Sequence, residues 1–117
     1  MEFAERKIIF YESYFADFYL EQSSMVQEKI EYVLRVIRLI DRVPKKFLEH
    51  MEGTDGLYEI KITVGTNIYR LFCCFDEGNV VVLFNGFQKK TQKTPMKVIT
   101  KALKLKKEYF EFKNLKG

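Results

Sequence analysis

The 117 residues are enough for one domain with its own core, and a content of 47% hydrophobic and 31% charged residues excludes a disordered chain. No apolar run approaches the roughly 20 residues that cross a bilayer, which excludes a membrane-spanning protein. The two cysteines are sequence neighbours and there is one histidine, so neither a disulfide nor a zinc site is expected. We therefore expect one cytoplasmic domain over residues 1–117, with reduced cysteines and no metal or other cofactor.

Positive charge is concentrated at the C-terminal end. Residues 86–117 hold ten lysines and two glutamates, a net charge of +8, whereas residues 1–85 hold ten basic and 14 acidic residues, a net charge of −4. Such asymmetry favours a polyanionic partner, with nucleic acid first and a membrane surface second. Taken alone, the count slightly favours a simpler interpretation, a solvated helix face that uses lysine.

The N-terminal part predicts a strand followed by a helical hairpin. Residues 6–13 are rich in β-branched and aromatic residues and predict the strand, and residues 14–22 predict a short helix. Ser24 and Gln27 have the spacing of a capping box at the start of a longer helix over 25–41. The apolar positions of that helix keep a helical spacing: Val26, Ile30, Val33, Leu34, Ile37 and Ile40.

Three strands and a final helix follow. The strands are predicted at 57–64, 67–75 and 79–87, separated by hairpin turns. Thr94 is the expected N-cap, with Pro95 at the first position of a helix that ends near residue 113. The chain is thus predicted to be α+β: an N-terminal strand, a helical hairpin, a three-stranded antiparallel meander completing a small mixed sheet, and a C-terminal helix. We expect the helices on one face of the sheet.

The other face of the sheet is the expected place for function. Alternation in the first strand of the meander puts Glu59, Lys61 and Thr63 on the polar face. Arg70 lies inside an apolar strand and needs a partner or a wet cleft. It either pairs with Glu59 across the strands or binds phosphate at the floor of a groove, since the guanidinium fork matches phosphate oxygens. Periodicity does not decide between the two.

Residues 56–95 resemble the centre of the RelE/HigB toxins, and most closely their phage-derived, HigB-like branch. The shared features are a strand with Glu-Ile-Lys, a hairpin, Tyr-Arg in the next strand, and a last strand that ends in Gly-Phe-x-Lys-Lys-Thr-x-Lys-Thr-Pro. The resemblance implies a type II toxin: a metal-independent endoribonuclease that cuts mRNA during translation. The partners that it implies are mRNA, the 70S ribosome and a helix-turn-helix antitoxin, with operator DNA bound only through the antitoxin complex and no membrane.

The resemblance also implies which residues are catalytic. The basic residue of the first hairpin strand corresponds to Lys61 and the central arginine to Arg70. The basic residue at the end of the last strand corresponds to Lys89 or Lys90. A second basic position of the RelE branch is occupied here by Glu59, and the C-terminal tyrosine of RelE and the histidines of some HigB relatives have no counterpart.

RNA cleavage by its own 2′-hydroxyl needs a base, cations for the extra phosphate charge and an acid for the leaving 5′-oxygen. We expect Arg70 to hold the phosphate, and Lys61 and Lys89 to add positive potential or to protonate the leaving oxygen. Glu59 is either the base or the partner in a simple salt bridge. His50 is an alternative base, although a lone histidine before the sheet is more often a surface residue. Base stacking by Tyr58 or Tyr69 is possible, but core packing is the better prediction for both.

The lysines outside the catalytic set are predicted to bind RNA and the ribosome. They are Lys90, Lys93, Lys97 and Lys101, with Lys104 and Lys107 extending the same basic surface. Two alternatives remain from the residues alone: a nucleic-acid-binding module without catalysis, and an interaction protein whose basic helix docks on an acidic partner.

Overall fold

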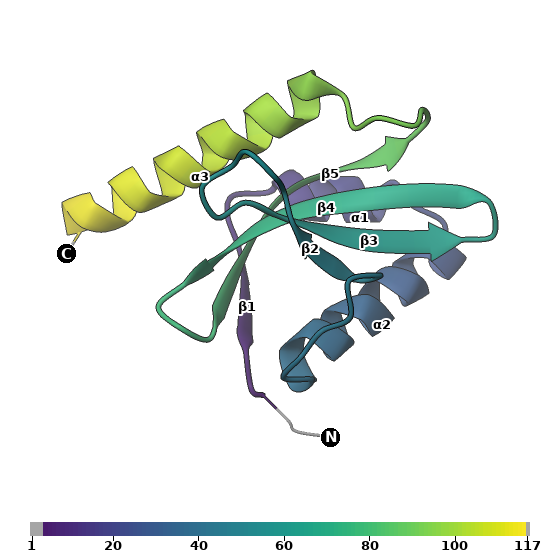
Figure 1. Ribbon diagram of the computed structural model, residues 1–117, viewed down its shortest axis with the longest axis horizontal. Helices are drawn as coiled ribbons and strands as arrows, with labels where there is room; N and C mark the ends of the chain where they lie inside the picture. The colour runs from purple at the N-terminus through teal and green to yellow at the C-terminus, as the bar shows by residue number, and fades with distance from the viewer. Residues whose placement is uncertain (1–3, 117) are drawn as a thin grey trace.

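The computed structural model describes residues 4–116, and its elements follow the predicted order with one addition, a short strand before the meander (Figure 1). In chain order the elements are β1 (Lys7–Phe10), α1 (Tyr14–Leu20), α2 (Ser24–Leu39), β2 (Leu48–His50), β3 (Tyr58–Val64), β4 (Asn67–Asp76), β5 (Val80–Lys89) and α3 (Met96–Lys116).

The strands form one mixed five-stranded sheet in the order β1-β5-β4-β3-β2. β1 pairs in parallel with β5, and the other neighbours are antiparallel. The predicted α+β class, the meander and the mixed sheet are therefore confirmed. The added strand β2 has three residues, which is too short for side-chain alternation to be recognised in a sequence.

The long helix of the hairpin begins one residue earlier than predicted. Ser23, and not Ser24, is the N-cap residue, and its side chain accepts a hydrogen bond from the Val26 amide at 3.3 Å. The apolar stripe of α2 is buried as predicted. At its C-terminal end, Arg6 donates side-chain hydrogen bonds to the carbonyls of Ile37, Ile40 and Asp41.

The helices cover both faces of the sheet, so the expectation that they lie on one face was wrong. α1 and α2 pack on one face, and α3 crosses the other, mainly over β4 and β5 (Figure 1). The two faces have separate cores because successive strand residues point to opposite sides. Cys73 belongs to the first core and Cys74 to the second, and both are free thiols. No helix among residues 4–116 is long and apolar enough to cross a bilayer.

The far end of α3 is fixed to the end of β4. Asp76 is buried and accepts hydrogen bonds from the Tyr109 hydroxyl at 2.7 Å and from Lys113 Nζ at 2.8 and 2.9 Å. The hydrogen bond from Lys113 lowers the pKa of the Asp76 carboxyl, whereas burial, together with the Asp76 carboxylate, raises the pKa of Tyr109 to about 12. This contact joins the C-terminal part of α3 to the end of β4.

A β-bulge in β5 changes which of its side chains lie on each face of the sheet. Register pairs Leu71 with Gly86 and Cys73 with Leu83, so two residues of β5 oppose one of β4. Gly86 lies where a side chain would collide, because a Cβ there would be 2.7 Å from Leu71 Cδ2 and 2.9 Å from a ring carbon of Phe18. Beyond the bulge, Phe87 lies opposite Arg70 and on the same face.

Candidate functional site

Four charged residues occupy two adjacent rows of the sheet on the face that α3 crosses. Glu49 on β2 lies opposite Glu59 on β3, and Lys61 on β3 lies opposite Arg70 on β4. Opposite residues of antiparallel strands have side chains on the same face, a few ångströms apart. We call Glu49, Glu59, Lys61 and Arg70 the charged cluster.

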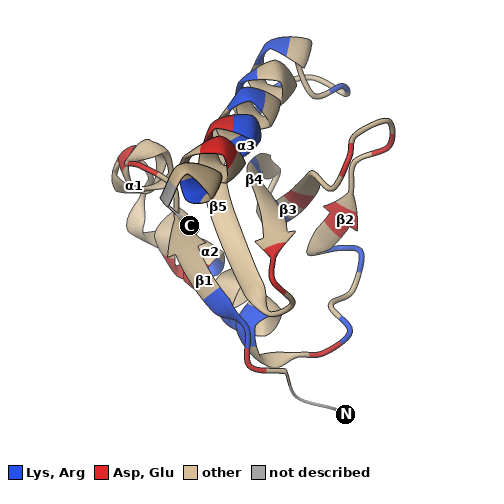
Figure 2. Cartoon of the chain, turned by 90° about the vertical axis from the view of Figure 1, so that its left-hand side faces the viewer, with Lys and Arg blue, Asp and Glu red and all other residues tan. Residues whose placement is uncertain are grey.

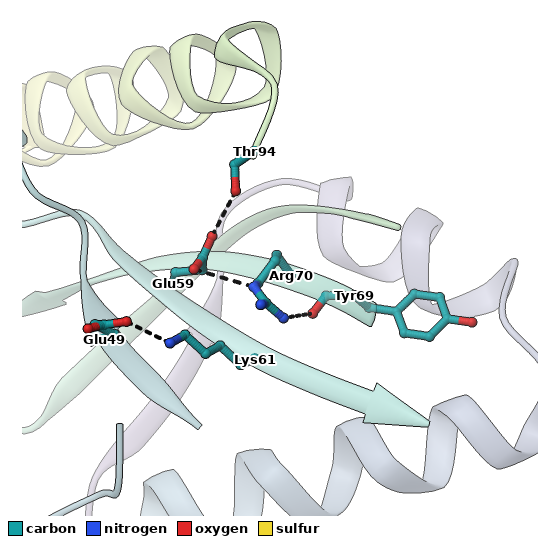
Figure 3. A network of polar contacts seen from close by, with 6 residues as sticks. All are labelled: Glu49, Glu59, Lys61, Tyr69, Arg70 and Thr94. Atoms are coloured by element: carbon teal, nitrogen blue, oxygen red, sulfur yellow. Dashed lines mark hydrogen bonds and ion pairs between the residues drawn. The ribbon is translucent and has the colours of Figure 1, made fainter. Parts of the chain in front are cut away.

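Each cation of the charged cluster is paired with a carboxylate of the other row (Figure 3). Lys61 Nζ lies 2.6 Å from Glu49 Oε1, and Arg70 Nε lies 3.3 Å from Glu59 Oε1. The hydrogen bond from Lys61 holds the pKa of the Glu49 carboxyl below its usual range. The Arg70 and Glu59 side chains are only 12% and 14% exposed, whereas Lys61 and Glu49 are 22% and 42% exposed. The first alternative for Arg70 is therefore confirmed, because it is paired with Glu59, whereas phosphate binding by Arg70 stays a prediction.

The guanidinium of Arg70 has hydrogen-bonding capacity to spare. Its contact with Glu59 lacks hydrogen-bond geometry, so the buried Nε has no hydrogen-bond partner among the described residues. Its Nη1 donates to the Tyr69 carbonyl at 3.2 Å (Figure 3). Since a guanidinium has five N–H donors, an anion reaching this site would find donors ready.

Thr94 approaches the charged cluster from the loop between β5 and α3. Its hydroxyl donates to Glu59 Oε2 at 3.3 Å (Figure 3). The prediction that Thr94 caps the final helix was therefore wrong. α3 begins at Met96, and the Pro95 carbonyl accepts from the amides of Val98 and Ile99. The hydroxyl is directed to the sheet instead of the helix.

Lys89 shares the face of the charged cluster. It is the last residue of β5, lies opposite Ile68, and is two residues beyond Phe87, the partner of Arg70. Lys90 and Lys93 follow in the exposed loop. Of the two candidates for the last basic position, Lys89 is the one on the same face as Arg70. We call Lys89, Lys90 and Lys93 the loop lysines; the first two line a hollow of about 350 Å³ beside Ile68.

The lysines of α3 gather elsewhere. Lys97, Lys101 and Lys104, the helix lysines, line a hollow of about 480 Å³ together with Asn85. Lys101 Nζ lies 4.7 Å from the centre of the Tyr14 ring, so this surface faces the α1 side of the helix. Lys107 is exposed and does not line the hollow. Figure 2 shows basic residues along α3 and acidic residues at β2, β3 and the loop between them. The basic surface is thus divided between the loop and the helix.

The aromatic and histidine candidates lie on the opposite face. Tyr69 is buried and packs edge-on against Phe18 of α1. The centre of the Tyr58 ring lies 4.9 Å from the centre of the Phe75 ring. His50 is the last residue of β2, not a loop residue, and its ring lies 5.2 Å from that of Tyr58. Core packing, the preferred prediction for both tyrosines, is confirmed.

One residue of the site was missed in the sequence analysis, and another was given the wrong role. Glu49 lies on β2, and neighbouring Phe47, Leu48 and the turn that follows are the only signals of that strand. Thr94 was found but given another role, because Thr-Pro before an apolar run is also the signature of a helix start. Among residues 4–116, no three His, Cys, Asp or Glu side chains gather closely enough to hold a metal ion.

The chain matches the model of a known protein family. Residues 17–107 match the family described as phage-derived protein Gp49-like (DUF891). The matched part begins inside α1 and ends inside α3, and it includes the charged cluster, the loop lysines and Thr94. No curated protein matches the sequence significantly.

Proposed function

The chain belongs to the phage-derived Gp49-like family, which lies within the RelE/HigB-type toxin group, and we propose that it is the toxin of a type II toxin–antitoxin system. In this proposal it is an endoribonuclease that cuts mRNA on the translating ribosome. RelE-type toxins are endoribonucleases, which supports an enzymatic function.

The charged cluster is the observation that carries the proposal. Two cations from neighbouring strands lie side by side on a sheet face, each held by a carboxylate. Such preorganised donors stabilise the extra negative charge of a phosphorane-like transition state, and one donor is typically worth about 3–4 kcal/mol. Arg70 is the phosphate ligand in this proposal because its guanidinium group has N–H donors that are not used in hydrogen bonds within the described residues.

The reaction uses the 2′-hydroxyl of the RNA as nucleophile. The Glu59 carboxylate takes the 2′-hydroxyl proton while the 2′-oxygen bonds to phosphorus. The bond from phosphorus to the 5′-oxygen breaks, and that oxygen receives a proton from the Lys61 or Lys89 ammonium. The products are a 2′,3′-cyclic phosphate and a 5′-hydroxyl end, so protons and charge balance without a further reactant.

The two lysine surfaces supply binding in this proposal. Lys89 lies on the same face of the sheet as Arg70, and the loop lysines contact the mRNA strand. The helix lysines lie on the α1 side of α3 and contact ribosomal RNA phosphates. A phosphate contact contributes affinity without sequence preference, which suits a protein that acts on many messages.

The partner in the cell is an antitoxin with a helix-turn-helix domain, and operator DNA is bound only through the complex. Membership of a toxin family supports the presence of such a partner. The adjacent reading frame gives the first check, since it should encode a small helix-turn-helix protein whose co-expression relieves toxicity.

The decisive experiment is inducible expression in a bacterium, with mRNA ends mapped by primer extension. We expect growth arrest and cuts positioned by codons in a translated message. The same message without its start codon is the control and should stay intact. Equal cutting of both messages would reject ribosome dependence, and ribosome binding without any cuts would favour a binding module without catalysis.

A further inference from the structure

The Glu59 carboxylate is held at both oxygens. Oε1 faces Arg70 Nε at 3.3 Å, and Oε2 accepts the Thr94 hydroxyl at 3.3 Å. The side chain is 14% exposed, so water replaces little of this contact. A carboxylate that is fixed at two points has its plane and its remaining lone pairs fixed as well.

Thr94 is itself held in place by the chain that follows it. The next residue, Pro95, has a locked φ angle, and its carbonyl accepts from the amides of Val98 at 3.2 Å and Ile99 at 3.4 Å. The backbone beside Thr94 is thus fixed at the start of α3, while Glu59 lies on strand β3 of the sheet. The far end of α3 is fixed to Asp76.

We infer that Thr94 is a positioning residue for Glu59: its hydroxyl orients the carboxylate so that a lone pair faces the 2′-hydroxyl of the substrate. The inference rests on the proposed function. A base works only when it lies within hydrogen-bond reach of its proton in the right direction, and a displacement of about 1 Å can cost roughly 100-fold in rate. In this proposal Thr94 contacts the Glu59 carboxylate and no atom of the substrate, so it acts through Glu59.

The hydrogen bond between Thr94 and Glu59 also joins the segment of the loop lysines to the charged cluster. Lys93 directly precedes Thr94, and Lys89 and Lys90 begin the same loop. In this proposal, RNA phosphates that bind the loop lysines also order the loop that carries the Thr94 hydroxyl, and this hydroxyl holds the Glu59 carboxylate. Binding of substrate and orientation of the base become parts of one arrangement.

The test compares variants that differ by one hydroxyl. Thr94→Val keeps the shape and removes the donor, and it should lower the single-turnover cleavage rate at saturating ribosome by about 10- to 100-fold while the KM for ribosomes stays unchanged. Thr94→Ser keeps the donor and should restore most of the rate. The matched control is Thr91→Val, which removes a hydroxyl of the same loop that bonds to the Lys93 carbonyl; its rate should equal that of the unchanged protein.

A double variant shows whether Thr94 acts through Glu59. In a Glu59→Gln background, Thr94→Val should cause no further loss of the residual rate, because no carboxylate is left to orient. Losses that multiply in the double variant would overturn the inference, and so would a Thr94→Val protein that cleaves at the full rate.

A measurement without cleavage separates this inference from the proposed function. The ¹³C chemical shift of the Glu59 carboxyl carbon at neutral pH should move in Thr94→Val and stay in place in Thr94→Ser and Thr91→Val. If the unchanged protein never cuts RNA, the proposed function fails, and with it the role of Glu59 as base. If the protein cuts RNA but the shift is the same in all variants, only the positioning role of Thr94 fails.

Discussion

Lys61 and Arg70 lie directly opposite each other on β3 and β4, with like charges on one face of the sheet. Opposed cations on neighbouring strands repel, and the structure offsets this with Glu49 and Glu59 in the next row. The carboxylates hold the two cations side by side. In the proposed function this arrangement is a preformed binding surface for the phosphate of the RNA.

Replacing Arg70 tests the phosphate ligand. Arg70→Ala should abolish cleavage on loaded ribosomes, and it should also lower the free energy of unfolding by about 1–3 kcal/mol, because the mostly buried Glu59 carboxylate loses its cation. Single-turnover cleavage and urea denaturation measure the two effects. An active Arg70→Ala protein would show that another group binds the phosphate.

Two further variants separate the two roles of Arg70. In the double variant Glu59→Gln/Arg70→Ala no carboxylate is left unpaired at this position, so part of the lost stability should return while cleavage stays absent. Arg35→Ala removes an exposed guanidinium on α2 and should change neither quantity. Recovery of cleavage in the double variant would contradict the assignment of both residues.

The loop lysines should govern binding. Replacing Lys89, Lys90 and Lys93 by Gln should weaken ribosome binding and make it less sensitive to salt, since each lost contact to a single strand reduces the log–log salt slope by about 0.7. The loss of all three contacts should reduce the log–log salt slope by roughly 2. Stability should move by no more than about 0.5 kcal/mol per site, because Lys90 and Lys93 are exposed and Lys89, at the end of β5, is only partly buried. Titration against ribosomes at several salt concentrations gives the slope.

Single variants distinguish the three lysines. Lys89→Gln should also lower the cleavage rate at saturating ribosome, because Lys89 shares the face of Arg70. Lys93→Gln should affect binding alone. The charge-matched control for the triple variant is Arg42→Gln/Lys45→Gln/Lys46→Gln, which removes three exposed positive charges before β2. An unchanged slope in the triple variant would mean that the loop lysines serve solubility.

Asp76 should make stability depend on pH. Lys113 lowers the pKa of this carboxyl from the ordinary value of 3.8, so its contribution to stability is fully present above about pH 4 and is lost as pH falls through the lower folded value. Asp76→Asn should therefore melt at a lower temperature than the unchanged protein at pH 7, with the difference shrinking below pH 4. Asp41→Asn, at an exposed position, should show no such difference. A constant gap at all pH values would exclude the ionic contribution.

Gly86 should not tolerate a side chain. Gly86→Ala places a Cβ 2.7 Å from Leu71 Cδ2 and 2.9 Å from Phe18, which should cost about 1–3 kcal/mol in the free energy of unfolding. Denaturation in urea measures the loss. Leu71→Ala should cost less in the Gly86→Ala background than alone, because the shorter side chain relieves the collision; equal costs would place the strain elsewhere.

The sequence predicted the elements that have a strong period. The stripe of α2 and the three meander strands were found because apolar residues recur at helical or alternating spacing over seven or more residues. β2 was missed because three residues carry no period. The placement of α3 on the opposite face was missed because alternation says which residues share a face, but not which helix covers it.

The charged cluster was only partly predictable. Lys61, Arg70 and Glu59 follow from alternation and from the resemblance, but the partner of Lys61 is Glu49, on the missed strand. Thr94 lies 35 residues from Glu59 in sequence, and no local pattern reports such a contact. The Ser23 cap shows the same limit at short range, since adjacent serines are equivalent until the backbone chooses one.

The parallel pairing of β1 with β5 has a consequence for how the protein is made. Lys7 pairs with Val80, so the first strand to leave the ribosome must wait for the last before it can join the sheet. Contacts between such distant segments form slowly, because a long loop has to close first. The nascent chain therefore remains an incomplete sheet until most of it has been synthesised. In the proposed function this order is protective, since the ribosome that makes the protein does not meet a completed sheet before β5 has been synthesised.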